Sequence, residues 1–474
     1  MQIHENFYAD GKWQPCHGHK RLDVVNPYNE EIIAKVATCA NEDVSAAVQA
    51  ASMAFASWSR TSIAERAALL RKIGQIMKDR SLELAQTITA ELGMPLKLAQ
   101  RIQVASPIAT FELTAQELDG FRWEESVGHS IVAKEAVGVV AAITPWNYPL
   151  HQIAAKVAPA LASGCTVVLK PSEITPLNAL LFAEILHAAG VPPGVFNLVL
   201  GTGPEAGEAL ACHPQVDLVS FTGSTVAGKR VMQLASQSVK RVRLELGGKS
   251  PSLVLPGSEL ARAVKTTVNS CFMNSGQTCS ALTRLIVPEQ DYAQAAEMAV
   301  AQAGSFVLGD PLHEGTKLGP LVSAVQRERV QSLIAKGIDD GAKVLTGGPQ
   351  YPGGGPGFFV APTVLGEVDA DNIIAQQEVF GPVLSILTYR DVEEAVAIAN
   401  STSYGLAAAV WGPDQGMALK TGRRIHSGQV DINGAAFNML APFGGVKQSG
   451  FGRELGRFGL EEYVELKSYQ LPVH

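Results

Sequence analysis

The sequence lacks a long apolar run, a basic stripe and a recognisable leader. None of its stretches approaches the ~18 consecutive apolar residues that a membrane-spanning helix needs. The first residues carry neither a basic region nor an apolar segment, so we expect no secretory signal. The formal net charge is −7. These features argue against nucleic acid or a membrane as a partner.

Motifs that pair cysteines are also missing. The six cysteines (16, 39, 165, 212, 271 and 279) are scattered along the chain and include no CxxC. This pattern is typical of free thiols in a reducing compartment, and it predicts a cytoplasmic protein. Two cysteines precede a histidine, but no second pair stands at zinc-finger spacing. We therefore expect no metal site.

A chain of 474 residues is too long for one small core and predicts roughly two or three domains. From about residue 137 the pattern alternates apolar strand, turn and helix, which indicates a doubly wound parallel sheet. The strands expected there are 138–143, 166–169, 196–200, 217–221 and 241–245. A second alternation runs from about 252 to 433. The segments 122–136 and 463–470 read as strands outside both sheets.

Helix signals concentrate in the N-terminal third of the chain. Asn41 is expected to cap a first helix. Ser62 and Glu65 form a capping-box pattern that opens a second, long helix. Gly93 is expected to end that helix.

Three motifs carry groups suited to carbonyl chemistry. Cys279 stands in Gly-Gln-Thr-Cys-Ser, Glu245 in Leu-Glu-Leu-Gly-Gly, and Asn147 in Thr-Pro-Trp-Asn-Tyr-Pro. A thiolate can attack an aldehyde, an amide can stabilise the oxyanion, and a carboxylate can activate water to release the acyl group. Each residue alone has a plainer interpretation. Cys279 fits a small buried hydrophobe, Glu245 an edge charge paired with Lys249, and Asn147 a turn residue between prolines.

Together and in this order, the motifs resemble the NAD(P)-dependent aldehyde dehydrogenase superfamily. The resemblance extends from Asn26 to Gly456. It implies a variant Rossmann-type doubly wound cofactor domain (1–121 and 137–246) and an α/β catalytic domain (247–447). It also implies a small β bridging domain (122–136 and 448–474) that pairs subunits into a homodimer or homotetramer.

The resemblance assigns roles to individual residues. Cys279 would be the nucleophile, Asn147 and the Cys279 backbone N–H the oxyanion hole, and Glu245 the general base. Lys156 and Glu454 match a proton relay. Glu245 favours hydrolysis, because branches that transfer the acyl group to coenzyme A usually lack this carboxylate. Two alternatives stay open: a CoA-acylating semialdehyde dehydrogenase, and a catalytically silent relative with a binding or structural role.

Two glycine clusters follow predicted strands, one at Gly201 to Gly207 and one at Gly223 to Gly228. By resemblance, Gly203 lies against the adenine, and Ser224 with the following helix start holds the pyrophosphate. Lys170 and Glu173 would bind the adenosine ribose, and Glu173 favours NAD over NADP. The cofactor-binding residues implied are Ile143, Thr144, Pro145, Trp146, Lys170, Glu173, Gly203, Gly207, Phe221, Gly223, Ser224, Leu246, Gln326, Glu378 and Phe380.

By resemblance, positions around Asn147 and Cys279 form a substrate tunnel. Its expected wall is Tyr148, Gln152, Ala155, Thr278, Ser280, Phe437 and Phe443. Ala155 stands where many relatives carry a bulky aromatic side chain, which predicts a wide mouth. No arginine or lysine falls at these positions to anchor a carboxylate. We therefore expect a small-molecule aldehyde that is apolar or aromatic.

Overall fold

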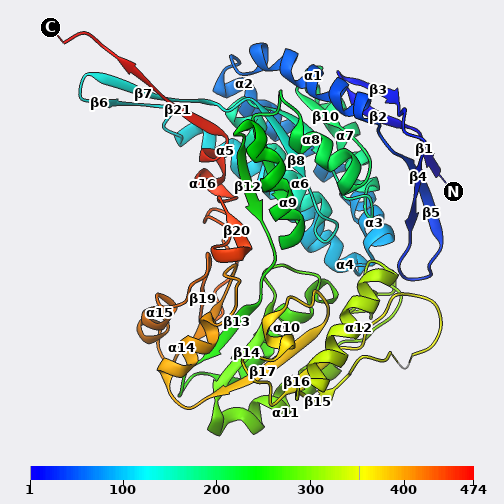
Figure 1. Cartoon of the computed structure of the whole chain (residues 1–474), viewed down its shortest axis with the longest axis vertical. Helices are drawn as coiled ribbons and strands as arrows, with labels where there is room; N and C mark the ends of the chain where they lie inside the picture. The colour runs from blue at the N-terminus through cyan, green and yellow to red at the C-terminus, as the bar shows by residue number, and fades with distance from the viewer. Residues whose placement is uncertain (1, 352, 474) are drawn as a thin grey trace.

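Two large sheets organise the chain, as Figure 1 shows for a computed structural model that describes residues 2–351 and 353–473. The first has eight strands in the order β20-β12-β11-β8-β9-β10-β2-β3, and the second has seven in the order β15-β16-β17-β14-β13-β18-β19. Each sheet lies at the centre of its own lobe, with helices around it (Figure 1). The fold is the α/β arrangement predicted from the alternating pattern.

The first sheet has a parallel centre and antiparallel edges. Its parallel strands are β8 (Val139–Ile143), β9 (Thr166–Lys170), β10 (Phe196–Leu198), β11 (Leu218–Thr222) and β12 (Arg241–Glu245). They match the five predicted strands to within two residues at each end. The antiparallel additions are β2 (Asn6–Ala9), β3 (Lys12–Pro15) and β20 (Gly450–Phe451). The central strands are buried and apolar, as expected when both faces of a sheet are covered.

Helices cover this sheet. They are α1 (Asn41–Trp58), α2 (Ile63–Asp79), α3 (Ser81–Leu92), α4 (Leu96–Leu98), α5 (Ala105–Gly120), α6 (Pro149–Ser163), α7 (Leu177–Ala189), α8 (Glu208–Cys212) and α9 (Thr225–Ala235). Short π-helical segments η1 (Ala99–Val104) and η2 (Gly203–Gly207) precede α5 and α8, and the 3₁₀ turn η3 (Ser236–Ser238) follows α9.

Two helix predictions were wrong in detail. Ala40, not Asn41, precedes the first turn of α1, and the Asp43 carboxylate accepts the Ala40 N–H from inside that turn. The capping box of Ser62 is present, but the helix that it opens stops at Arg80, where the backbone leaves helical geometry. A separate helix, α3, then runs to Gly93. The apolar periodicity continues across the break, so sequence could not show it.

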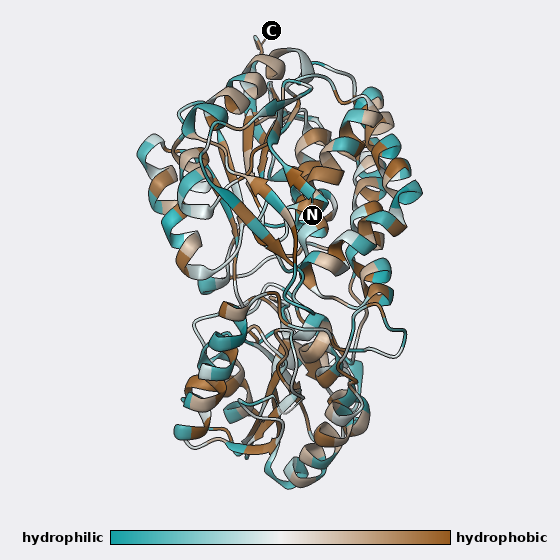
Figure 2. Cartoon of the chain, turned by 90° about the vertical axis from the view of Figure 1, so that its right-hand side faces the viewer, coloured by the Kyte–Doolittle hydropathy of each residue, from teal (hydrophilic) through white to brown (hydrophobic). Residues whose placement is uncertain are grey.

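The second lobe repeats the alternation. Its strands are β13 (Ser250–Val254), β14 (Leu282–Pro288), β15 (Lys343–Thr346), β16 (Thr363–Gly366), β17 (Val383–Tyr389), β18 (Ala409–Trp411) and β19 (Asp431–Ile432). Its helices are α10 (Leu260–Phe272), α11 (Tyr292–Gly304), α12 (Ala324–Asp339), α13 (Ile373–Gln376), α14 (Val392–Asn400) and α15 (Gln415–Gly422). The 3₁₀ turns are η4 (Met273–Gly276), η5 (Glu289–Asp291) and η6 (Lys447–Ser449). In both lobes the strands are mostly hydrophobic and polar residues concentrate on the helices (Figure 2).

A three-stranded antiparallel sheet projects from the first lobe as an arm (Figure 1). It contains β6 (Glu124–Val127), β7 (Ser130–Ala136) and β21 (Val464–Gln470), in the order β21-β7-β6. Both predicted extra strands therefore lie outside the large sheets. Within the segment 448–474, however, β20 pairs with β12, and α16 (Gly456–Glu461) packs against α5 and α6. A second small sheet joins β1 (Gln2–His4), β5 (Ile32–Ala37) and β4 (Arg21–Val25).

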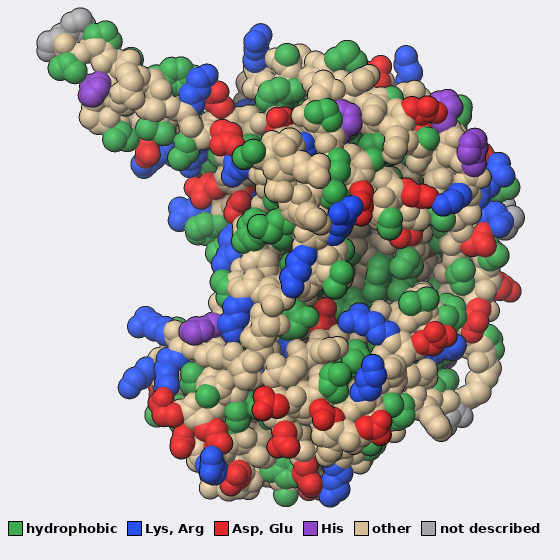
Figure 3. Space-filling model, viewed as in Figure 1, with side chains coloured by type: hydrophobic (Ala, Val, Ile, Leu, Met, Phe, Trp, Pro, Cys, Tyr) green, Lys and Arg blue, Asp and Glu red, His purple; other side chains and the backbone are tan. Residues whose placement is uncertain are grey.

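The parallel strands of the first sheet end side by side. Ile143 pairs with both Lys170 and Phe221, and Thr222 pairs with Glu245. In a doubly wound sheet, the crevice beyond these carboxyl ends is where ligands bind. The surface is hollowed between the two lobes (Figure 3). Across the described ranges, no helix combines the length and apolarity needed to cross a membrane.

Candidate active site

A cavity of about 140 Å³ lies at the junction of the lobes and brings together residues predicted from separate motifs. Cys279, Glu245 and Asn147 all line it. Its remaining lining residues are Pro145, Trp146, Thr222, Gly223, Ser224, Leu246, Gly247, Gln326, Arg329, Glu378 and Phe380. Loops after β8, β11 and β12 supply one wall, and the second lobe supplies the other.

Cys279 lies in a turn of unusual backbone shape. After α10 ends, Asn274 and Ser275 adopt left-handed φ values of 53° and 57°, and Gly276 follows at 76°. A side chain at Gly276 would clash with the backbone of Gly381, so only glycine fits there. The turn leaves Cys279 half-buried against Phe443 and Leu455. Burial, then the nearby carboxylates of Glu245 and Glu378, raise the pKa of the Cys279 thiol well above its usual value.

Glu245 is the last residue of β12 and is buried. Neither of its carboxylate oxygens has a hydrogen-bond partner within the described part of the chain. Burial and the charge of Glu454 raise its pKa well above the usual range, while Lys156 opposes the shift. A carboxylate with a raised pKa is a stronger base than a free one, which suits a general base.

The two relay candidates come together although they are far apart in sequence. Lys156 Nζ donates to Glu454 Oε1 and to Thr222 Oγ1, both at 2.6 Å. The pair is almost completely buried. Burial works to raise the pKa of Glu454, but Lys156 and Arg243 outweigh it and lower that pKa below its usual value. Glu454 therefore stays charged beside Glu245.

Asn147 is buried, and its side chain is oriented by the nucleophile turn. Its Nδ2 donates to the backbone carbonyl of Gln277, two residues before Cys279, at 3.0 Å. An amide nitrogen carries two N–H groups, so the second is available to another acceptor. The arrangement suits an oxyanion hole.

The edge of the first sheet fits a dinucleotide. Ser224 is the N-cap of the 11-residue helix α9, whose first N–H groups can bind a pyrophosphate. Lys170 is buried, with Nζ 3.0 Å from Glu173 Oε2, and burial lowers the pKa of Lys170 despite the neighbouring carboxylate. A β-carbon at Gly203 would meet nothing within 4 Å, so that surface is open. Ile143, Thr144, Phe221 and Gly207 belong to the same edge, outside the main cavity.

At the other end of the cavity, Glu378 Oε1 accepts the backbone N–H of Gly248 at 3.0 Å. Burial raises the pKa of Glu378 to about 7. Phe380 has a left-handed φ of 60°, and its ring meets Trp146 edge-on at 5.3 Å. Gln326 Nε2 donates to the Phe380 carbonyl at 2.8 Å, which holds this loop against α12.

Some cavity residues were not predicted from sequence. Arg329 donates to the backbone carbonyl of Glu378 at 2.9 Å. It follows Gln326 by three residues on α12, and this helical spacing could have signalled it. Thr222 and Gly247 adjoin predicted residues at the ends of β11 and β12.

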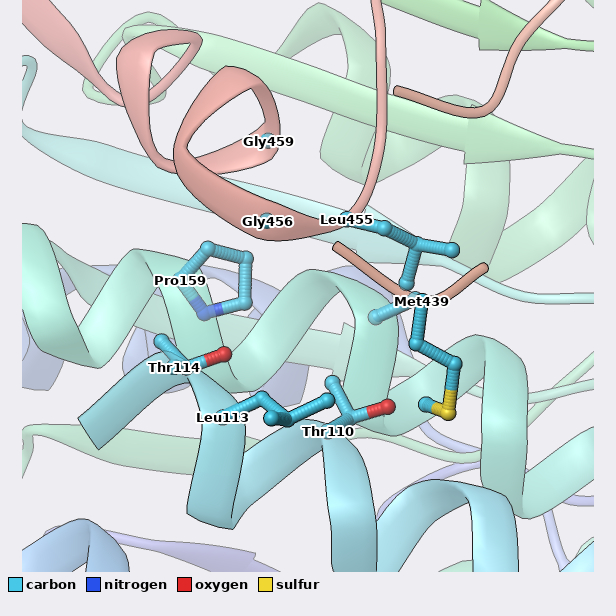
Figure 4. A pocket seen from close by; sticks show the side chains of 9 residues that line it. Thr110, Leu113, Thr114, Pro159, Met439, Leu455, Gly456 and Gly459 are labelled. Carbon is cyan, nitrogen blue, oxygen red and sulfur yellow. The ribbon is translucent and has the colours of Figure 1, made fainter. Parts of the chain in front are cut away.

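None of the predicted substrate residues lines the main cavity. Tyr148 and Thr278 share a hydrogen bond between hydroxyls at 2.8 Å, and the rings of Phe437 and Phe443 meet at 6.0 Å. Gln152 is buried, whereas Ser280 is half-buried beside the thiol. Ala155 lines a second, smaller cavity with Thr110, Leu113, Thr114, Pro159, Met439, Leu455, Gly456 and Gly459 (Figure 4). Among these, Leu455 also contacts the residues around Cys279.

Comparison with known proteins identifies the family. The model of the aldehyde dehydrogenase family matches residues 13–469. The chain belongs to this family. It is therefore an oxidoreductase. The family match confirms the resemblance inferred from the three motifs.

Individual aldehyde dehydrogenases match over almost the whole chain. The chain is 46% identical to a 3-succinoylsemialdehyde-pyridine dehydrogenase from Pseudomonas, over 99% of this chain and 98% of the relative. The crystal structure of a cysteine-to-alanine mutant of aldehyde dehydrogenase C from Pseudomonas syringae, with NAD⁺ and octanal, superposes with a TM-score of 0.97. It is 48% identical and covers 98% of this chain and 96% of its own. An NAD⁺ complex from Bacillus cereus is 38% identical, with a TM-score of 0.96 over 99% of this chain and 97% of its own. These similarities confirm the predicted fold.

Proposed function

We propose that this aldehyde dehydrogenase oxidises an apolar aldehyde to the carboxylic acid with NAD⁺, and that water takes up the acyl group. The observation that carries the proposal is the shared cavity: a thiol, a carboxylate and an amide from three segments line it together. The same cavity extends to a helix N-terminus and a buried carboxylate suited to a dinucleotide.

In the first half of the reaction, the Cys279 thiol loses its proton to solvent and its sulphur bonds to the aldehyde carbon. The carbonyl oxygen becomes an oxyanion, which the Asn147 amide and the Cys279 backbone N–H stabilise. NAD⁺, when bound, supplies the acceptor for the hydride that leaves the substrate carbon. Loss of that hydride leaves a thioester on Cys279.

In the second half, Glu245 removes a proton from water as the oxygen attacks the thioester carbon. The carbon–sulphur bond breaks, the acid leaves and the thiolate is regenerated. The unpartnered carboxylate oxygens of Glu245 suit this role. The buried pair of Lys156 and Glu454 offers a route for the proton away from Glu245.

Preference for NAD⁺ over NADP⁺ rests on Glu173. Its carboxylate can accept hydrogen bonds from ribose hydroxyls and would repel a 2′-phosphate. The relatives solved with NAD⁺ support this preference.

The proposed substrate class rests on the side chains beyond Cys279. Phe437, Phe443 and Leu455 are apolar, and the smaller cavity around Ala155 has no charged lining residue. A relative bound to octanal, and another named for a pyridine-bearing semialdehyde, support an apolar aldehyde of medium length. We propose that the enzyme works in the cytoplasm as a homodimer or homotetramer.

A panel of aldehydes assayed with NAD⁺ and NADP⁺, with and without coenzyme A, tests the proposal. We expect the best kcat/KM for medium-chain or aromatic aldehydes with NAD⁺, and the free acid as product without coenzyme A. Cys279→Ala should abolish turnover and still bind NAD⁺. Product formation that requires coenzyme A, or no turnover with any aldehyde, would overturn it.

A further inference from the structure

We propose that Asn274 is a positioning residue, which acts with Gln103 to hold the Asn147 amide over Cys279. The inference rests on the proposed oxyanion role of Asn147. It concerns side chains that neither line the main cavity nor belong to the three motifs that identified the reaction.

The Asn274 side chain joins two loops. Its Nδ2 donates to the backbone carbonyl of Asn147 at 2.9 Å and to that of Gln277 at 3.2 Å. Asn147 Nδ2 donates to the same Gln277 carbonyl at 3.0 Å. One buried amide therefore links the backbone that carries the oxyanion donor to the backbone that carries the nucleophile.

Gln103 is a second hydrogen-bond donor to the backbone carbonyl of Asn147. Its Nε2 donates to the Asn147 carbonyl at 3.0 Å, and its side chain is fully buried. It belongs to η1, a six-residue π-helical segment ahead of α5. Such segments are often found at functional sites, because the extra residue in the turn redirects a side chain.

The left-handed backbone at Asn274 supports a positioning role for its side-chain amide. Two successive non-glycine residues in the left-handed region, Asn274 and Ser275, are unfavourable unless their surroundings hold them. Gln277 supports the turn, because its Nε2 donates to the Asn274 carbonyl at 3.1 Å and its Oε1 accepts the Val322 N–H at 2.9 Å. The left-handed turn aims the Asn274 amide at both carbonyls.

This geometry has a consequence for the reaction. With both its carbonyl and one amide N–H engaged, Asn147 can rotate little, and its second N–H keeps one direction. A displacement of about 1 Å at a reacting group can cost ~100-fold in rate. Loss of the Asn274 amide should therefore lower kcat through Asn147, because Asn274 itself does not line the main cavity.

The test is a double-mutant cycle between Asn274→Gly and Asn147→Ala. Glycine keeps the left-handed backbone and removes the amide. In the otherwise unchanged enzyme, kcat measured well below Tm should fall by ~10- to 100-fold, with the aldehyde KM and the NAD⁺ Kd unchanged. Tm should fall as well, because two buried carbonyls lose a hydrogen-bond donor. In the Asn147→Ala background, the same substitution should cost less than ~3-fold, because the group that it positions is gone.

Ser275→Gly is the matched control. This neighbour has the same left-handed backbone, but its hydroxyl donates to the Gly319 carbonyl at 2.7 Å, away from Asn147. It should keep the kcat of the unchanged enzyme. If Asn274→Gly does not fold, Gln103→Met tests the inference from another element and should lower kcat by ~3- to 10-fold, again only when Asn147 is present.

Equal losses from Asn274→Gly in both backgrounds would overturn the inference, as would an unchanged kcat. Failure of the proposed function looks different: Asn147→Ala alone would then leave kcat unchanged.

Discussion

At the scale of single residues, the site combines a thiol and a carboxyl whose pKa values are both raised. Burial is the first cause for Cys279 and for Glu245. Both shifts favour the neutral form of the group over its anion. Raised pKa values of this kind in a cavity are typical of groups that exchange protons during catalysis.

We predict that Glu245→Gln accumulates acyl-enzyme. The amide keeps the shape of the side chain but cannot take a proton from water, so steady turnover should fall by roughly 10²- to 10⁴-fold. Rapid mixing with aldehyde and NAD⁺ should show one equivalent of NADH and then a near-stop. Mass spectrometry should find the acyl group on Cys279. If neither burst nor adduct forms, Glu245 is needed earlier, to take the thiol proton.

We also predict that cofactor choice depends on the single residue Glu173. Glu173→Ser removes the carboxylate 3.0 Å from Lys170 and frees that lysine to meet a 2′-phosphate. The ratio of kcat/KM for NAD⁺ to that for NADP⁺ should fall by about tenfold or more, the scale of one charged hydrogen bond. Steady-state kinetics with both cofactors measure the ratio. A ratio equal to that of the unchanged enzyme would place discrimination elsewhere.

At the scale of elements, the packing of α3 on α7 depends on a buried carboxyl. Glu91 of α3 accepts the backbone N–H groups of Leu177 and Asn178 at 2.7 and 3.1 Å, and the Asn178 amide at 2.6 Å. These donors lie at the N-terminus of α7, where a carboxylate is favourable. Burial nevertheless outweighs them and raises the pKa of Glu91 to about 7.

This raised pKa predicts a pH dependence of stability. The folded state binds the Glu91 proton more tightly than the unfolded state, so the contribution is complete below about pH 4.5 and is lost as pH rises through about 7. Relative to Glu91→Gln, the native chain should lose up to about 3 kcal/mol between pH 5 and pH 8. Urea denaturation at several pH values measures the difference.

Glu83→Gln is the control for this prediction, because Glu83 lies on the same helix and has the opposite shift. Its hydrogen bond from Arg80 lowers its pKa, so its contribution is lost as pH falls. As pH falls, the native chain should therefore gain stability relative to Glu91→Gln and lose stability relative to Glu83→Gln. Parallel curves would contradict the assignment for Glu91.

At the scale of the whole molecule, the arm of β6, β7 and β21 carries the proposed contact between subunits. It projects from the first lobe, and among the described strands β21 pairs only with β7 (Figure 1). Val127, Leu466 and Tyr469 are exposed on it. An open strand edge with apolar side chains favours pairing with another chain.

We predict that Leu466→Asp lowers the oligomeric state. A charge on this exposed strand should weaken pairing between two copies of the arm, and sedimentation velocity should show a smaller species than the proposed homodimer or homotetramer. Met53→Asp is the control, because Met53 is equally exposed but lies on α1. A native chain that sediments as a monomer at micromolar concentration would contradict the proposed assembly.

The sequence by itself determined the fold class and most of the groups that meet in the main cavity. Alternating strands and helices specify a doubly wound sheet, and side chains just after such strands reach its ligand-binding edge. Glu245 and Ser224 could therefore be located from their places after predicted strands. Cys279 and Asn147 needed the motifs as well, because a lone cysteine or asparagine has several ordinary uses.

Only the tertiary structure decided which distant side chains touch. Lys156 and Glu454 are 298 residues apart yet share a hydrogen bond, and Ala155 meets Met439 and Leu455 around one cavity. The hydrogen bonds of Asn274 depend on a left-handed turn that no residue pattern requires, since asparagine tolerates that conformation without demanding it. Local sequence encodes element type and strand ends, whereas contacts such as these follow from how the completed elements pack.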